Sequence, residues 1–173
     1  MDKIPSFEKD HDLLQPGLHF STLQKGVMTL DMRCKKPNAG DFISPAALHS
    51  IEHMLATALR SGPQKEQILY FGPMGCRTGF YLLTEGLTFR AAADALRAAL
   101  DACMGMNEVP GALRKECGNY LEHDLAGAKR ELAAYIELLD ELPADVLRAE
   151  EARAEAAFAA AQASATQSKE AQA

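Results

Sequence analysis

An alternating stretch near the start of the chain constrains the fold more than any other feature. Within residues 17–33, two short apolar segments are separated by Gln24-Lys25-Gly26. In the second segment Met28, Leu30 and Met32 alternate with polar residues, a period of two that is typical of a strand with one buried face. We therefore expect a β-hairpin here.

Further strands and helices follow this hairpin. Strand-like segments at 67–71 and 79–84 flank a tight stretch at 72–77. Ser44 and Pro45 are typical of the start of a helix, which we expect to run to about residue 60. A second helix, capped by Thr88, is expected to run to about Met104 and to be ended by Gly105. A third, with apolar spacings of three and four, is expected directly after Gly118. Since no β-α-β alternation occurs, the sequence predicts one α+β domain with an antiparallel β-sheet packed against α-helices.

The composition changes after Pro143. The remaining residues are rich in Ala, Glu, Gln and Ser, with Val146, Leu147 and Phe158 as the sizeable apolar side chains. Such a segment has high helix propensity but little to bury. We therefore predict a main domain at 1–144, which holds every candidate catalytic residue, and a helical or disordered C-terminal tail at 145–173.

Charge and composition disfavour several classes of function. Lysine and arginine number 18 against 24 aspartates and glutamates, so the formal net charge is −6 and nucleic acid would be repelled. No run reaches the roughly 18 apolar residues of a membrane-spanning helix, and no secretion signal is visible. The four cysteines form no Cys-x-x-Cys pair, which argues against a disulfide framework. We expect a cytoplasmic protein without nucleic-acid or membrane partners.

Two histidines one helical turn apart form the first candidate site. The segment His49-Ser50-Ile51-Glu52-His53 lies in the helix expected after Pro45. Because residues at i and i+4 share a helix face, both imidazoles can reach one metal ion, with Glu52 beside His49. The alternative is that both are ordinary surface or hydrogen-bonded core residues, because a histidine pair needs further ligands to make a metal site.

Cys117 is the cysteine best placed to supply a third ligand. It precedes Gly118, where we expect the last helix to begin, so unpaired N-H groups would stabilise its thiolate. Two histidines and one cysteine leave a fourth coordination position open, which is typical of a catalytic site.

Cys76 is a candidate for proton transfer. It lies between Gly75 and Arg77 in the turn expected between two strands, and a neighbouring cation would lower the pKa of its thiol. The alternative is a thiol buried in the turn. Cys34 and Cys103 are expected to be unreactive, with Cys103 in the core.

The other histidines are less informative. His11 follows Asp10 in a polar segment, which suits either a substrate contact or a surface loop. His19, in a strand, and His123, near the start of a helix, are expected to be structural.

Five motifs follow one another between about residues 4 and 139. They are Ser6-Phe7-x-x-Asp10-His11; Asp31-Met32-Arg33 with Pro37-Asn38; His49-x-x-Glu52-His53; Pro73-Met74-Gly75-Cys76-Arg77-Thr78-Gly79; and Cys117-Gly118 with His123-Asp124-Leu125 and Gly127-Ala128-Lys129-Arg130. In this order they resemble the S-ribosylhomocysteine lyase (LuxS) family.

The resemblance implies a homodimer with two identical active sites at the subunit interface. It also implies one divalent metal per subunit, natively Fe(II), with Zn or Co possible. The implied metal ligands are His49, His53 and Cys117, and the implied acid-base pair is Glu52 and Cys76. The implied substrate contacts are Ser6, His11 and Arg33, partly across the interface.

The family's reaction cleaves the thioether of S-ribosylhomocysteine. A carbonyl group moves from C1 to C3 of the ribose through enediolates, with the metal as Lewis acid and Cys76 and Glu52 moving protons. Homocysteine then leaves by β-elimination. The other product, 4,5-dihydroxy-2,3-pentanedione, is the precursor of autoinducer-2, which links the family to methionine metabolism and quorum sensing.

Two departures from the family and two rival functions stay open. The tail after Pro143 exceeds the family's usual end and carries no matching motif. Phe71-Gly72 stands where many members have an Ile-Ser or similar pair, a difference that could reshape the homocysteine end of the pocket. His-x-x-Glu-His is also the signature of inverzincin-type zinc peptidases. A non-enzymatic binding module, stabilised by its metal, is the other alternative.

Overall fold

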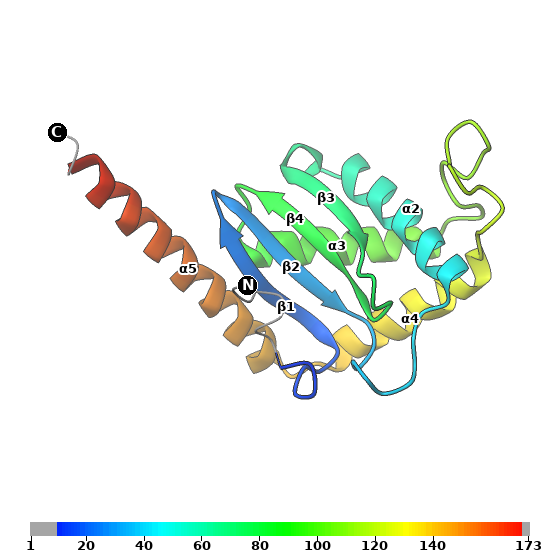
Figure 1. Ribbon diagram of the computed structural model, residues 1–173, viewed down its shortest axis with the longest axis horizontal. Helices are drawn as coiled ribbons and strands as arrows, with labels where there is room; N and C mark the ends of the chain where they lie inside the picture. Colours follow the sequence, from blue (N-terminus) through cyan, green and yellow to red (C-terminus); the bar gives the residue numbers. More distant parts are fainter. Residues whose placement is uncertain (1–9, 171–173) are drawn as a thin grey trace, which may run out of the picture.

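Four strands form a single antiparallel sheet. The structure, a computed structural model, describes residues 10–170. The strands β1 (Gly17–Gln24), β2 (Val27–Arg33), β3 (Ile68–Pro73) and β4 (Gly79–Glu85) lie in the order β1-β2-β4-β3 (Figure 1). Lys25 and Gly26, which join β1 to β2, have φ values of 51° and 83°, as a two-residue hairpin turn requires. The predicted hairpin is confirmed.

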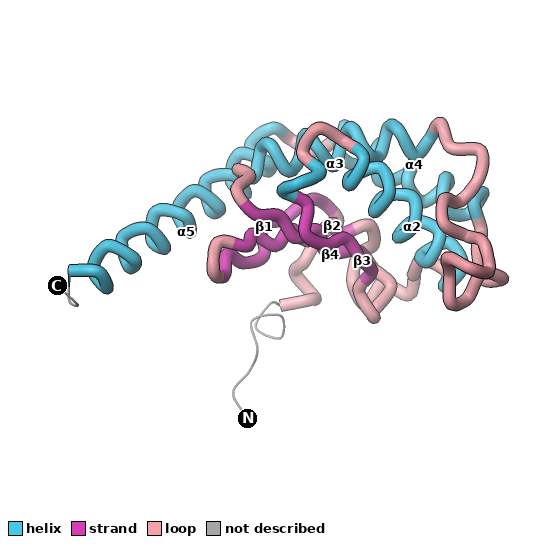
Figure 2. Tube along the Cα trace, turned by 90° about the horizontal axis from the view of Figure 1, so that it is seen from above, coloured by secondary structure: helices cyan, strands magenta, loops and turns pink. Residues whose placement is uncertain are grey.

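Three helices cover one face of this sheet. They are α2 (Pro45–Ser61), α3 (Phe89–Met104) and α4 (Leu125–Glu141), and all three lie on the same side of the strands (Figure 2). Met28, Leu30 and Met32 of β2 point toward them and are fully buried. The structure therefore confirms an α+β fold in which an antiparallel sheet packs against helices.

The opposite face of the sheet carries polar residues. Asp31 and Arg33, which are also buried, alternate with these apolar residues of β2, and Asp31 pairs across the ladder with Tyr81 of β4. Among residues 10–170, no helix covers this face (Figure 2).

The third helix begins later than the sequence suggested. α4 starts at Leu125, because Asp124 caps it by accepting a hydrogen bond from the backbone N of Gly127 at 2.8 Å. Leu121, which lies between Gly118 and the start of this helix, is 79% exposed. The chain from 106 to 124 is instead a loop, and Cys117 lies within it.

The segment after Pro143 is helical, and its first half belongs to the core. α5 (Ala144–Glu170) packs against β1, with Ala154 only 1% exposed. The Glu150 carboxylate accepts a hydrogen bond from the backbone N of Phe20 at 3.0 Å. The expectation that this segment buries little is therefore wrong for its first half, because alanines pack closely and a buried carboxylate fixes the helix. The second half extends away from the sheet and the other helices (Figure 1).

None of the described helices combines the length and apolar character that a membrane crossing requires.

Candidate metal centre

Helix α2 presents two imidazoles toward one point. Its start is fixed by Ser44, whose hydroxyl accepts a hydrogen bond from the backbone N of Ala47 at 3.3 Å. His49 and His53 follow one turn apart, and their ring centroids are 4.8 Å apart in an edge-to-face arrangement. The i, i+4 spacing therefore brings both rings together, as the sequence predicted.

Cys117 reaches the same point from the loop between α3 and α4, which lies beside α2 (Figure 1). Its Sγ lies 3.4 Å from Nε2 of His49, and the side chain is buried. Because α4 begins eight residues further on, the expected stabilisation by a helix start is wrong. The backbone N of Asn119 donates to the sulfur instead, at 3.4 Å.

Backbone carbonyls orient both histidines. Nδ1 of His49 lies 2.9 Å from the carbonyl oxygen of Glu122, and Nδ1 of His53 lies 2.9 Å from that of Pro110. Since a carbonyl oxygen can only accept, each Nδ1 carries the proton and each Nε2 keeps its lone pair. This is the usual arrangement around histidines that bind a metal.

His123 joins this cluster, although we expected it to be structural. Its ring stacks on that of His49, with centroids 4.1 Å apart and planes at 26°. One ligand atom from each of His49, His53, Cys117 and His123 lies within 4.8 Å of the others. Helical periodicity does not identify His123, because this residue lies 70 residues after His53 in the sequence and only the folded chain brings the two together. Its place in the fifth motif was the one available signal.

The donor set fits a divalent transition metal. Imidazole nitrogens and a thiolate are the ligands preferred by Zn²⁺ and by related ions such as Fe²⁺ and Co²⁺. In addition, Nε2 of His123 is buried and has no hydrogen-bond partner among the residues described, as expected for a nitrogen that faces a ligand.

Cys76 lies in the turn between β3 and β4 and is exposed. Partial burial opposes ionisation, but a hydrogen bond with Thr78 and the nearby charge of Arg33 outweigh it, so the pKa of the Cys76 thiol lies below its ordinary value. Sγ is 3.0 Å from Oγ1 of Thr78 and 3.8 Å from Nη1 of Arg33. The relevant cation is therefore Arg33. Arg77, the neighbour in sequence, lies over the ring of Phe42 instead.

Arg33, the cation beside this thiol, is buried and held in place by other side chains. It is 2% exposed and forms a bidentate pair with Asp31, at 3.1 Å and 2.6 Å. Its Nη1 also donates to Oγ1 of Thr78 at 2.6 Å. Because Thr78 accepts from Arg33, its own hydroxyl hydrogen is free to be donated to the Cys76 sulfur.

The other predicted site residues are less constrained. Glu52 is half-buried on α2, three residues after His49. His11 lies in a turn before β1 and is half-buried, whereas Ser6 lies outside the described residues. Burial raises the pKa of the Cys103 thiol to about 12 and also raises that of Cys34, which disfavours the reactive thiolate form of both.

The departure at Phe71-Gly72 acts on the sheet and not directly on the metal cluster. Phe71 is buried and stacks on Phe80, with ring centroids 5.2 Å apart. A Cβ at Gly72 would collide with the hydroxyl of Tyr70, which lies over the strand at this position. Glycine therefore makes room for Tyr70, which is 46% exposed.

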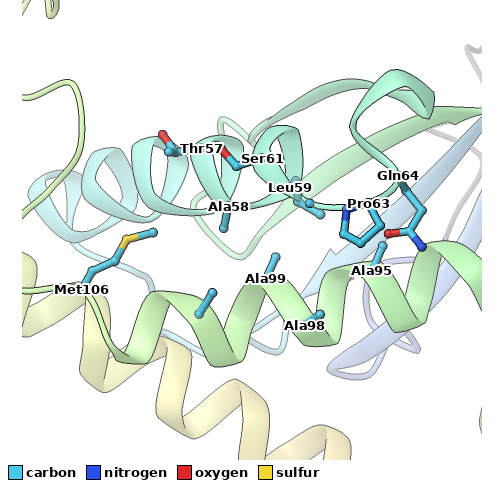
Figure 3. A pocket seen from close by; sticks show the side chains of 12 residues that line it. Thr57, Ala58, Leu59, Ser61, Pro63, Gln64, Ala95, Ala98, Ala99 and Met106 are labelled. Atoms are coloured by element: carbon cyan, nitrogen blue, oxygen red, sulfur yellow. The ribbon is translucent and has the colours of Figure 1, made fainter.

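A cavity of about 470 Å³ between the second half of α2 and α3 is not the site (Figure 3). Its walls are mostly small or apolar residues, which include Ala58, Ala95, Ala99 and Met106. No metal-ligating or acid-base side chain lines it, so the chemistry lies at the other end of α2.

Comparison with known proteins gives one consistent family. A family model described as S-Ribosylhomocysteinase (LuxS) matches residues 4–144. A protein of Borreliella afzelii named S-ribosylhomocysteine lyase is 42% identical over 155 residues, which cover 86% of this chain and 99% of the relative. Proteins with the same name from Phocaeicola vulgatus and Clostridium acetobutylicum are 42% and 40% identical, and they cover 85% of this chain in each case. The match covers 96% of the Phocaeicola vulgatus protein and 98% of the Clostridium acetobutylicum protein.

Proposed function

Because this chain belongs to the S-ribosylhomocysteinase (LuxS) family, we propose that it cleaves the thioether of S-ribosylhomocysteine to homocysteine and 4,5-dihydroxy-2,3-pentanedione. The observation that carries this proposal is the convergence of His49, His53 and Cys117 on one point. The enzyme is a metal-dependent carbon-sulfur lyase.

Three side chains are proposed to hold the metal. His49 and His53 use the Nε2 atoms that their carbonyl contacts leave free, and Cys117 uses its sulfur. A divalent ion bound there supplies Lewis-acid polarisation of the substrate's carbonyl group. We propose Fe(II) as the native ion, with Zn and Co as alternatives, because this donor set accepts all three.

Cys76 is proposed as the first base. An enediolate forms when a proton is removed from the carbon next to the carbonyl group, and a thiolate with a lowered pKa can accept that proton near neutral pH. The contacts with Thr78 and Arg33 stabilise the thiolate form of this sulfur. Arg33 therefore serves the substrate through Cys76, since its guanidinium already contacts Asp31, Thr78 and Cys76.

Glu52 is proposed as the partner that returns protons. Carbonyl migration from C1 to C3 needs a proton removed from one atom and added to another in each step, so two groups with different proton affinities are required. Glu52 lies on the same helix as the two metal-binding histidines and can serve the sugar's oxygens. With the carbonyl at C3, the C4 proton becomes acidic, and its removal expels homocysteine from C5.

The remaining assignments follow from family membership. We propose a cytoplasmic homodimer with an active site at each side of the subunit interface. Ser6 and His11 are proposed to contact substrate, in part across that interface. The dione is proposed to be the precursor of autoinducer-2, which would place the enzyme in methionine metabolism and quorum sensing.

A thiol-release assay tests the function. Metal-loaded, reduced enzyme incubated with S-ribosylhomocysteine should release one free thiol per substrate, measured with a colorimetric thiol reagent. Cys76→Ala should keep its metal and lose turnover, whereas Cys117→Ala should lose metal, with affinity reduced at least about 100-fold. Absence of thiol release from the metal-loaded wild type would rule out the lyase.

The same preparations separate the rival functions. An inverzincin-type zinc peptidase would cleave casein and release no thiol. A metal-stabilised binding module would lose thermal stability on metal removal and show no turnover with either substrate.

A further inference from the structure

The segment before β1 carries His11 but has little apolar packing to hold it. Residues 10–16 are all exposed or half-buried, and Leu13 is 74% exposed. A hydrogen bond closes the turn within the segment, since the carbonyl oxygen of Asp10 accepts from the backbone N of Leu14 at 3.2 Å. Because so little apolar surface is buried here, polar contacts with the rest of the chain must fix where the segment lies.

His19 of β1 contacts this segment and helix α5 at the same time. Its Nε2 lies 2.9 Å from the carbonyl oxygen of Gln15, near the end of the segment. Its Nδ1 lies 3.2 Å from the carboxylate of Glu150 on α5. That carboxylate is itself held in place, because it accepts from the backbone N of Phe20 at 3.0 Å and from Nη1 of Arg153 at 2.7 Å. One imidazole ring therefore connects the segment to α5.

Both contacts together require the protonated form of His19. A carbonyl oxygen and an ionised carboxylate can only accept hydrogen bonds, so each ring nitrogen must carry a hydrogen. The neutral ring carries only one, and its other nitrogen would then face an acceptor with a lone pair. Loss of the proton therefore breaks one of the two contacts, and the connection between the segment and α5 is lost.

The charges around His19 favour the protonated form. The charged groups that face it are Glu150 and Arg153 on α5, Asp31 opposite it on β2, and Asp10, which lines the same cavity of about 310 Å³. Arg153 is paired with Glu150, so the surroundings are acidic overall. Burial lowers the pKa of His19, but its hydrogen bonds and the nearby carboxylates outweigh this effect, and the pKa in the folded protein lies above 6.5. The connection is therefore complete below pH 6.5 and is lost as pH rises through the folded pKa.

We propose that His19 is a positioning residue: in its protonated form it connects the segment that carries His11 to α5 and so holds His11 in place for the substrate. This inference rests on the proposed lyase function, in which His11 is a substrate contact. Glu150 lies beyond residues 4–144, which the family model matches. The metal ligands and Cys76 take no part in these contacts, so loss of the proton should weaken substrate binding and leave the chemical steps unchanged.

The test compares His19→Asn with the wild type in steady-state kinetics on S-ribosylhomocysteine between about pH 5.5 and 9. The amide nitrogen of asparagine can replace Nδ1 toward Glu150, but it cannot reach the Gln15 carbonyl. At the acid end its KM should exceed that of the wild type about tenfold, with kcat within about twofold. At the alkaline end the ratio of the two KM values should fall to within about twofold, because the wild-type ring is then neutral.

A second measurement leaves His19 in place. The KM ratio should fall around the pH at which the His19 ring of the wild type loses its proton, which NMR of the ring hydrogens measures. In Glu150→Gln the proton should be lost about one pH unit lower, because the carboxylate no longer stabilises the imidazolium, and KM should rise at a correspondingly lower pH. Glu155→Gln, which changes an exposed residue of the same helix, should match the wild type in both measurements.

The outcomes separate positioning from a purely structural role. A KM ratio that is the same at every pH would overturn the proposal, and so would a KM for His19→Asn equal to that of the wild type throughout. A loss confined to kcat would also overturn it. If His19→Asn does not fold, the kinetics of Glu150→Gln decide, and an unshifted rise of KM contradicts the proposal. A metal-loaded wild type that releases no thiol would instead overturn the lyase function, and this inference with it.

Discussion

At the scale of single residues, Cys76 owes its chemistry to contacts that lie apart from it in sequence. The order of contacts is Asp31 to Arg33 to Thr78 to Cys76, and each partner orients the next. A buried charge pair thus helps to lower the pKa of an exposed thiol, which combines access for substrate with a fixed electrostatic environment.

Removing the hydroxyl of Thr78 tests this chain of contacts. Thr78→Val should raise the pKa of the Cys76 thiol by about one to two units, because a hydrogen bond to a charged group is worth about 1.5–3 kcal/mol. The measurement is the rate of iodoacetamide alkylation of Cys76 against pH. Thr29→Val, on β2, should leave the pH profile unchanged. An identical profile for Thr78→Val would show that Thr78 does not stabilise the thiolate.

The sequence predicted some of these residues better than others. His49 and His53 were found because the helical period fixes their spacing, and Cys117 because it was the cysteine that could complete them. Arg77 was wrongly expected to act on Cys76, since adjacency in the chain says little about a turn in which Arg77 adopts a φ of 59° and points elsewhere. His123 was missed because a loop, and not a period, brings it to the site.

At the scale of helices and strands, the attachment of α5 to β1 depends on one carboxylate. Glu150 contacts Nδ1 of His19 at 3.2 Å, accepts from the backbone of Phe20, and is joined to Arg153 at 2.7 Å. Nε2 of His19 lies 2.9 Å from the carbonyl of Gln15.

The alternation of apolar and polar residues predicted the hairpin of β1 and β2. The attachment of α5 to β1 joins residues far apart in sequence and has no periodic signal, so the packing of α5 could not be predicted.

The attachment should depend on pH. Burial lowers the pKa of His19, but its contacts with Glu150 and Gln15 outweigh this effect, so the pKa in the folded protein lies above 6.5. The stability that protonated His19 contributes is complete below pH 6.5 and is lost as pH rises through the folded pKa. Burial raises the pKa of Glu150, but its contacts with His19, Arg153 and the backbone of Phe20 outweigh this effect, so the pKa in the folded protein lies below 4.5. The stability that the Glu150 carboxylate contributes is complete above pH 4.5 and is lost as pH falls through the folded pKa. The pair is therefore strongest between about pH 4.5 and 6.5.

Glu150→Gln should loosen α5 most within this window. We expect the free energy of unfolding at pH 5.5 to fall by about 1–3 kcal/mol and the amides of α5 to exchange faster with solvent. At pH 8 the loss should be smaller, because neutral His19 no longer attracts the carboxylate. Urea denaturation and hydrogen exchange measure the two effects, with the exposed Glu155→Gln as the matched control. Equal losses at both pH values would contradict the charge pairing of His19 with Glu150.

At the scale of the whole molecule, the sheet has two unlike faces. One is covered by helices and apolar, while the other carries Arg33, Asp31 and Tyr81 and has no described helix over it (Figure 2). The two faces follow from strand alternation, so the sequence predicted them together with the fold class. The surface that the second subunit of the proposed dimer would cover does not follow from alternation, because a single sequence does not reveal a contiguous exposed patch.

The proposed shared active sites make a quantitative prediction for mixed dimers. His53→Ala removes a metal ligand and His11→Ala removes the proposed contact from the partner subunit, so each homodimer should be inactive or nearly so. In a heterodimer one site combines the intact metal centre of one subunit with the intact His11 of the other, and the second site has both defects. Random mixing makes about half of the dimers mixed, so roughly a quarter of all sites, and of wild-type activity, should return. If His11 instead serves the metal centre of its own subunit, every site in the mixture keeps one defect, and activity will stay at the level of the separate variants however long the subunits exchange.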